Sequence, residues 1–346
     1  MKVGLTYNLK KTPLNNELND SYIEFDDEDT INAIKNALIK NGHEVIPIEA
    51  DNNIFKKIKD TSPDIVFNIA EGIKGESRES HVPALLELLE IPYTGSGPLT
   101  LAIALNKAIT NDILKYHNIN TSRYQIFKKH NEKLSQLLTF PLIVKPIQEG
   151  SSKGIKNESL VKNEKDLMFQ IKRVIDSYNQ FVIVEEYIDG KEFTVSILGN
   201  DPPIILPLVE IDFNQLPVSA NKIYSYEAKW LWDTPEKPIE MFKCPAELDM
   251  HTQKNISNIA LQVFNILGCK DICRIDGRLN KKGQFYVLDV NPLPGLIPDP
   301  KAHSCFPESA IAANYTYDEL INTILFCAIK RYKLEHLLHN NFIIPR

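Results

Sequence analysis

Short apolar strands alternate with amphipathic helices over the first hundred residues, and this alternation limits the fold more than any other feature. It predicts strands at 2–7, 43–48, 64–69 and 91–95, and helices at 29–41, 54–59 and 81–89. The run Asp-Ile-Val-Phe-Asn-Ile at 64–69 is typical of a strand buried on both faces. The pattern therefore indicates an α/β domain with a parallel sheet that helices cover on both sides.

This architecture also predicts where a ligand binds. Ligands of open parallel sheets lie beyond the carboxyl ends of the strands. The loop that begins at Asn8 and the segment 70–79 each follow such a strand end. We therefore expect these two segments to line a site.

The rest of the chain divides into two further regions. In 101–187 we expect helices at 101–117 and 164–178 and strands at 124–127, 142–146 and 181–186. In 188–346 we expect strands at 192–198, 204–211, 272–280 and 284–291, helices at 250–267 and 317–339, and a long irregular segment at 214–245. A length of 346 residues fits two to three domains. The predicted domains are 1–100, 101–187 and 188–346.

The overall charge and the apolar patterning exclude several classes of protein. A net charge of −6 argues against a nucleic-acid binder and against an anionic membrane surface as the main partner. The short apolar stretch after Met1 is followed by lysines, and no run approaches the roughly 20 apolar residues of a membrane helix. Five scattered cysteines favour reduced thiols over disulfides or zinc ligands. These features predict a cytoplasmic protein.

A predicted strand that ends near Lys145 runs into a glycine- and serine-rich turn at 147–155. Successive backbone N–H groups and the hydroxyls of Ser151 and Ser152 can surround phosphate oxygens, with Lys145 supplying positive charge. The pattern is not a Walker A loop, because no G-x-x-x-x-G-K-[ST] occurs. A flexible surface turn after an edge strand is the alternative.

Two predicted strands joined at 281–283 carry acidic and amide side chains. Residues two apart on a strand share a face, so Asp276 lies on one strand face, and Asp289 and Asn291 share a face of its partner. Their oxygens suit Mg²⁺. A solvated polar face is the alternative, which is weakened because Ile275, Leu279, Leu288 and Val290 are expected to form an apolar opposite face.

A third segment, 181–195, is a strand, a turn at Asp189-Gly190 and a second strand. Its apolar residues could contact an adenine ring, and Glu192 could accept hydrogen bonds from ribose hydroxyls. By itself this pattern is common to many strand pairs.

Six segments in this order resemble the ATP-grasp superfamily, specifically its D-alanine–D-alanine ligase-like branch, over about residues 60–335. They are IPYTGSG with Asn106-Lys107 after it, FPLIVKPIQEGSSKGI, VEEYIDGKEFTV, YSYEAKW, RIDGRL and DVNPLPGL. The resemblance implies an α/β fold of three domains. A Rossmann-like parallel-sheet domain would supply the N-terminus, and two further lobes would clamp ATP.

The resemblance also implies roles for individual residues. Phosphate contacts would come from Lys107, Lys145, Ser151, Ser152 and Lys229. Adenosine contacts would come from Glu185, Glu186, Ile188 and Glu192. Tyr226, in a lid at 214–245, would join the lid to the serine loop. Two Mg²⁺ ions, or Mn²⁺, would lie on Asp276, Asp289 and Asn291, and Arg274 with the Gly295 N–H would stabilise an oxyanion.

The chain departs from the family mainly where substrates bind. The first loop lacks the family's Gly-Gly-x-Ser-x-Glu, so the candidates to hold the first substrate's ammonium are Glu17, Glu24, Asp26 and Glu76. Asp289 stands where the family usually has glutamate. Beyond Gly295, the candidates for the second substrate's carboxylate are Lys301, His303 and Ser304.

The sequence thus predicts an ATP- and Mg²⁺-dependent carboxylate–amine ligase that joins two small amino acids through an acylphosphate. One alternative within the fold is a ligase of L- or non-alanine amino acids or of a pathway-specific carboxylate. Others are a carboxylate or alcohol kinase and a non-catalytic nucleotide-binding protein. The expected partners are small-molecule substrates, and family analogy suggests a homodimer.

Overall fold

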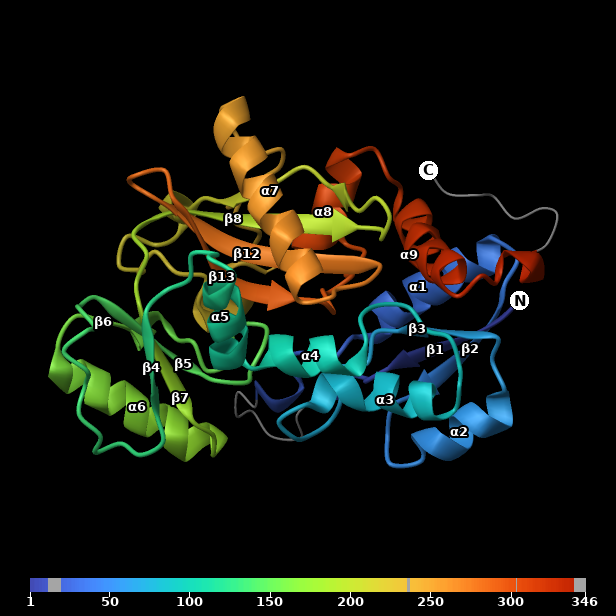
Figure 1. The fold of residues 1–346 in the computed structure, drawn as a ribbon, viewed down its shortest axis with the longest axis horizontal. Coiled ribbons are helices and arrows are strands. Elements are labelled where there is room, and N and C mark those ends of the chain that lie inside the picture. Colours follow the sequence, from blue (N-terminus) through green and yellow to red (C-terminus); the bar gives the residue numbers. More distant parts are fainter. Residues whose placement is uncertain (12–19, 235–236, 303, 339–346) are drawn as a thin grey trace.

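The computed structural model describes residues 1–11, 20–234, 237–302 and 304–338. Three sheets lie in three parts of the molecule, and the N-terminal sheet is at the opposite end from the central one (Figure 1). Within the described residues, no helix is long and apolar enough to cross a membrane.

The N-terminal sheet is parallel, as predicted. It consists of β1 (Lys2–Tyr7), β2 (Glu44–Glu49) and β3 (Ile65–Asn68) in the order β2-β1-β3. Around it lie α1 (Glu28–Lys40), α2 (Ile54–Thr61) and α3 (His81–Leu88). Asp27 caps α1 by accepting a hydrogen bond from the Thr30 N–H. The expected strand at 91–95 is reduced to a single bridge between Tyr93 and Val66.

Both faces of this sheet are buried, but one of the covering helices comes from the far end of the chain. Helix α9 (Tyr317–Arg331) contributes Ile321 and Leu325 to the same core as Ile34 and Leu38 of α1. The opposite face packs on α2 and α3. Helix α9 is shorter than the predicted helix 317–339. It ends at Arg331, and a 3₁₀ turn follows at Glu335–Leu337.

The central sheet is antiparallel with one covering helix. Its strands are β4 (Tyr124–Phe127), β5 (Leu142–Pro146), β6 (Leu160–Val161) and β7 (Val182–Glu186), in the order β4-β7-β5-β6. Helix α6 (Glu164–Tyr178) packs on it through Leu167, Ile171 and Val174.

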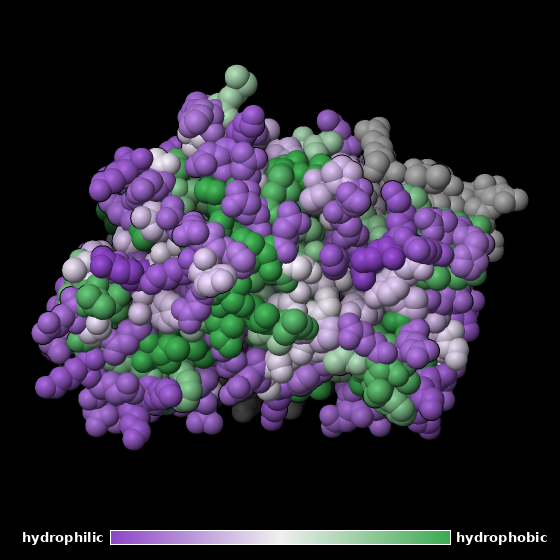
Figure 2. Space-filling view, in the orientation of Figure 1, coloured by the Kyte–Doolittle hydropathy of each residue, from purple (hydrophilic) through white to green (hydrophobic). Residues whose placement is uncertain are grey.

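The single helix expected at 101–117 is two helices, α4 (Pro98–Leu105) and α5 (Lys107–Tyr116). The break falls at Asn106, whose side chain accepts a hydrogen bond from the Ile109 N–H and so caps α5. Apolar residues gather near the middle of the surface in Figure 2, in the region of α4 and α5, where Leu99 and Ile109 are exposed. The break places Lys107 in the first position of α5.

The C-terminal sheet follows the order β11-β10-β8-β12-β13, with β9 paired to β8. Its strands are β8 (Gly190–Leu198), β9 (Ile204–Ile205), β10 (Val209–Ile211), β11 (Phe242–Lys243), β12 (Ile272–Asn280) and β13 (Phe285–Asn291). Helix α7 (Met250–Ile266) packs on it. The strand expected at 204–211 is split, since Pro207 has no N–H for the ladder. Helix α8 (Cys305–Ala312) was not predicted.

The segment 214–245 is not wholly irregular. It contains a π-helical turn at Ala228–Trp232, and its residues Leu216, Ala228 and Met241 form a small core with the preceding Phe213. This core gives the segment a defined shape over the cavity described next.

Candidate active site

A cavity of about 510 Å³ lies where the three sheets approach one another. All three regions contribute to its wall, among them Lys10, Glu71, Glu79, Lys107, Lys145, Ser151, Glu192, Lys229, Arg274, Asp276, Asp289 and Gly295. The carboxyl ends of β1 and β3 lead into segments that line it, as the parallel topology predicts.

Two buried lysines lie at one side of this cavity. Lys145 is the next-to-last residue of β5, and its Nζ lies 2.6 Å from the Glu185 carboxylate of β7. Burial disfavours the Lys145 charge, but Glu185 outweighs it and the pKa of Lys145 is raised. Lys107 donates to the Glu149 carbonyl at 2.7 Å and lies 3.6 Å from Asp289. Both ammonium groups are thus held inside the cavity before any ligand arrives.

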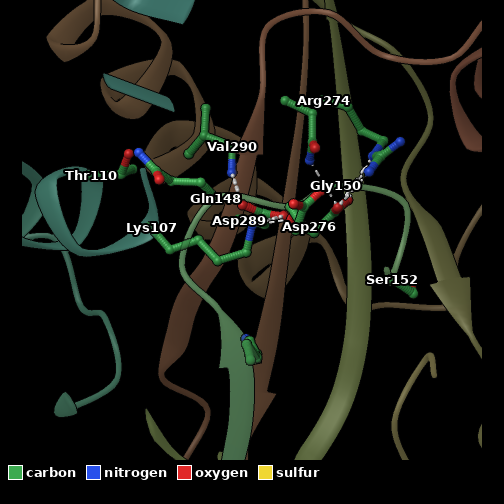
Figure 3. A network of polar contacts seen from close by, with 12 residues as sticks. Lys107, Thr110, Gln148, Gly150, Ser152, Arg274, Asp276, Asp289 and Val290 are labelled. Carbon is green, nitrogen blue, oxygen red and sulfur yellow. Dashed lines mark hydrogen bonds and ion pairs between the residues drawn. The ribbon is translucent and has the colours of Figure 1, made fainter. Parts of the chain in front are cut away.

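Strands β12 and β13 bring the three predicted metal-binding side chains together. Asp276 lies opposite Asp289 in the ladder, and the Asn291 amide donates to Asp276 at 3.1 Å. Thr194 of β8 donates to the other Asp276 oxygen at 2.9 Å. Figure 3 shows Lys107, Asp289 and Asp276 directed toward one another.

Arg274 lies beside this carboxylate group. Its guanidinium donates to Asp276 from Nε at 3.0 Å and from Nη2 at 2.9 Å, a pairing also visible in Figure 3. Burial opposes the charge, yet Asp276 raises the pKa of Arg274. A permanent cation therefore lies beside the predicted metal ligands.

A bulge in β13 corrects one expectation. The ladder shifts between Asp276 and Gly277, and Leu288 falls at the irregularity. Leu288 lines the cavity beside Asp289, so it does not belong to the apolar opposite face that strict alternation predicts. Gly277 is required here, because a Cβ would lie 2.3 Å from the Phe285 ring.

The predicted adenosine contacts Glu185, Glu186, Ile188 and Glu192 all line the cavity. Glu192 accepts a hydrogen bond from Arg278 at 2.8 Å, and Arg278 also donates to the Ile188 carbonyl at 3.1 Å. Sequence reasoning did not assign Arg278 a role, although its alternation with Arg274 and Asp276 on β12 placed it on the same face. It fixes both Glu192 and the backbone of the turn.

The lid segment contacts the serine loop closely. Ser152 donates to the Tyr224 carbonyl at 2.7 Å, and the Trp230 ring donates to the Ser151 carbonyl at 3.1 Å. Ser151 and Ser152 have φ values of 48° and 60°, a left-handed backbone that side chains rarely adopt. Tyr226 contacts the loop through its backbone N–H, which donates to Ile155 at 2.7 Å.

Lys229 and the Gly295 turn complete the cavity wall. Burial and the neighbouring Arg274 lower the pKa of Lys229 to about 8, since no described carboxylate forms an ion pair with it. Beyond Gly295, Lys301 and Ser304 line the cavity, and Ser304 donates to the Gly295 carbonyl at 3.1 Å. His303 lies outside the described residues.

Comparison with known proteins places this arrangement in a family. A family model described as D-ala D-ala ligase C-terminus matches residues 107–326. The D-alanine–D-alanine ligase of Carboxydothermus hydrogenoformans is 34% identical over 310 residues, which cover 87% of this chain and 93% of that protein. The chain belongs to the D-alanine–D-alanine ligase family.

Two further comparisons fit this membership. An uncharacterized protein, y4sG, of Sinorhizobium fredii is 34% identical over 86% of each chain. A Bacillus anthracis D-alanine–D-alanine ligase crystallised with ATP superposes with a TM-score of 0.72 at 26% identity, over 97% of this chain and 99% of that one. The ATP-grasp fold and the class of ATP-dependent C–N ligase, both expected from the motifs, are confirmed.

The four residues that the sequence offers as partners for the first substrate's ammonium group lie in different places in this structure. Glu17 lies outside the described residues, and Glu76 is exposed and absent from the cavity wall. Glu24 accepts two hydrogen bonds from Arg78, both at 2.9 Å, and a third from the Gly150 N–H at 2.6 Å. Asp26 lines the cavity.

Sequence reasoning missed two carboxylates in the segment after β3. Glu71 and Glu79 both line the cavity, and Glu79 is only 9% exposed. Burial is the largest cause that raises the pKa of Glu79, to about 8, and the pKa of Glu71 well above its usual range. The position after a parallel strand indicated the segment, but the spacing of its acids did not identify which of them face the cavity.

Proposed function

We propose that this protein couples the carboxylate of one amino acid to the amine of a second, with ATP converted to ADP and phosphate in the presence of Mg²⁺. The observation that carries the proposal is the convergence of Lys107, Lys145, Arg274 and the Asp276–Asp289 pair in one cavity beneath a lid. Family membership supports the ligase chemistry, and the identity of the two substrates belongs to the proposal.

The reaction needs two steps that this site can serve. The γ-phosphoryl group leaves ADP and bonds to a carboxylate oxygen, which gives an acylphosphate. The amine lone pair then forms the C–N bond, the C–O bond to phosphate breaks, phosphate leaves with the electron pair, and the amine loses a proton. Lys107, Lys145 and Lys229 would neutralise and position the phosphates in the first step.

The second step develops negative charge on the former carboxylate oxygen. We assign its stabilisation to Arg274 and the Gly295 N–H, which both belong to the cavity wall. A positioned donor of this kind contributes about 3 kcal/mol. The lid, which Trp230 and Tyr224 attach to the serine loop, would exclude the water that hydrolyses an acylphosphate.

Asp276, Asp289 and Asn291 are suited to hold Mg²⁺, since all three can offer oxygen and converge on adjacent strands. Mn²⁺ accepts the same ligands. When bound, the metal would neutralise charge on the transferring phosphoryl group. Asp289 is one methylene shorter than glutamate, so its oxygens reach less far from β13.

A kinase of the same fold is the second candidate, and a non-catalytic nucleotide-binding protein the third. Arg274 and the Gly295 turn favour the ligase over the kinase, because only the amine attack produces an oxyanion. The buried lysines and paired aspartates favour catalysis over mere binding.

The test is ADP release with MgATP and pairs from a panel of D- and L-amino acids, with mass spectrometry of the products. A ligase gives a condensation product that lacks one water, whereas a kinase gives a phosphorylated compound. Absence of ADP across the whole panel contradicts the proposed function.

A further inference from the structure

Three carboxylates at the N-terminal side of the cavity have no hydrogen-bond or ion-pair partner in the part of the chain that the structure describes. Asp26 follows β1, and Glu71 and Glu79 follow β3; all three line the cavity. Among residues 1–11, 20–234, 237–302 and 304–338, none donates a hydrogen bond to these carboxylates or forms an ion pair with them. Glu79 is more than nine-tenths buried.

The neighbouring charges are already committed to each other. Arg78 pairs with Glu24 at 2.9 Å and with Glu149 at 3.3 Å, and Lys153 pairs with Glu149 at 2.9 Å. Glu24, Arg78, Glu149 and Lys153 thus form a network of alternating negative and positive side chains whose charges sum to zero.

The remaining cations of this wall do not balance the three acids. Lys107 contacts Glu149 and Asp289, and together with Arg78 it lowers the pKa of Glu79, but burial outweighs both cations. Lys10 lies 5.0 Å from the Trp230 ring centroid and lowers the pKa of Asp26 only in part, since burial and Asp27 raise it to about 7. Lys10 can pair with one of the three acids, which leaves two carboxyl groups without a nearby cation among the described residues.

Buried carboxylates without a cation carry a large desolvation cost, and a ligand can relieve it. Among the described residues, no group of three or more acids, histidines or cysteines is arranged to hold a metal ion. Ammonium groups, each with three N–H donors, suit carboxylates that line a cavity.

We propose that the amino acid whose carboxylate is phosphorylated is a diamino acid, with its α-ammonium and its side-chain ammonium both bound among Asp26, Glu71 and Glu79. This inference rests on the proposed function and narrows its first substrate. The bonds that form and break are those already given, because the second ammonium takes no part in them.

Matched pairs of amino acids, with and without a side-chain ammonium group, test whether the site binds that second ammonium. Lysine is compared with norleucine, and ornithine with norvaline, each as the D and the L isomer, with the same acceptor panel and MgATP. One charge-assisted contact predicts that the diamino member has a kcat/KM at least about tenfold higher than its uncharged partner. Equal or better turnover of norleucine and norvaline overturns the inference while the ligase function stands.

Equilibrium binding separates the inference from catalysis. Lysine, ornithine, norleucine and norvaline are titrated into the protein with MgADP in a calorimeter. Tighter binding of the diamino acids supports the cationic site even where no ADP is released, an outcome that counts against the ligase alone. Binding without preference, or no binding of any of the four, contradicts the inference.

Variants locate the effect. Glu79→Gln and Glu71→Gln should each reduce the lysine-to-norleucine ratio by about tenfold and change norleucine turnover much less. Glu76→Gln, in the same segment but exposed, is the matched control and should keep the ratio. Both cavity variants replace a carboxyl group whose ionisation burial disfavours with a neutral amide of similar size, so they should fold, which thermal unfolding checks. A ratio that persists in both refutes the assignment.

Discussion

Arg78 donates two hydrogen bonds of 2.9 Å from one nitrogen to both carboxylate oxygens of Glu24. The contact joins the loop after β3 to the loop after β1. Since Glu24 also accepts from the Gly150 N–H, and Arg78 donates to the Gln148 carbonyl at 2.8 Å, it joins both loops to the serine loop of the central sheet. These contacts thus connect the proposed substrate end of the cavity to its proposed phosphate end.

Replacing Arg78 by Met should destabilise the protein by about 3–5 kcal/mol, because it leaves Glu24 buried without a cation and Glu149 with Lys153 alone. Urea unfolding measures the loss. The exposed pair of Lys172 and Asp176 provides the control, since Lys172→Met should cost less than about 1 kcal/mol. A similar loss of stability for both substitutions would contradict the prediction that the buried Arg78 ion pairs contribute more than an exposed pair.

Lys145→Met should reduce ATP turnover by at least about a hundredfold, because the phosphate charge loses a positioned cation. It should also lower stability, since Glu185 then lacks its ion-pair partner. Adding Glu185→Gln separates these effects. The double variant should regain part of the lost stability without regaining turnover, and recovered turnover contradicts the role assigned to Lys145.

Stability should fall as pH rises from about 5 to about 8 in the absence of substrate. The pKa values of Asp26 and Glu79 are raised by burial to about 7 and about 8, so in this window the folded state holds protons that the unfolded state has released. The free energy of unfolding therefore decreases with pH. Thermal unfolding at pH 5, 6, 7 and 8 should show a shallower decline in Glu79→Gln, and identical slopes would contradict the assignment.

Trp230→Phe should weaken closure of the lid, because it removes the N–H that Ser151 accepts while keeping an aromatic ring. We expect KM for ATP to rise about fivefold, the equivalent of one neutral hydrogen bond, and more ADP to form per molecule of condensation product. Trp232→Phe, within the lid's own small core, is the control. An unchanged ratio of ADP to product in Trp230→Phe counts against the water-excluding role.

Asp276→Asn should lower the affinity for Mg²⁺ strongly, so that a higher Mg²⁺ concentration is needed for turnover. Asp289→Glu should retain turnover, because the family usually has glutamate there. Titration of initial rate against Mg²⁺ and against Mn²⁺ checks both. Full activity of Asp276→Asn at unchanged Mg²⁺ concentration contradicts the metal assignment.

The sequence by itself determined the features that depend on local spacing. Period-two alternation on β12 and β13 predicted that Asp276, Asp289 and Asn291 converge, and the strand–turn pattern after Lys145 predicted the serine loop. The parallel N-terminal sheet followed from alternating strands and helices. Each of these needs only neighbours along the chain or one hairpin partner, so the local pattern contains the information.

Only the tertiary structure decided which acids meet in the cavity. Arg78 neutralises Glu24, while Glu71 and Glu79 remain without a described partner, and this distribution depends on how two loops from separate strands pack against Gly150. The attachment of α9 to α1 and the position of Leu288 at a bulge are likewise set by packing. Contacts between segments distant in sequence leave no period in the chain, so the balance of charge around the cavity is fixed only when the three sheets come together.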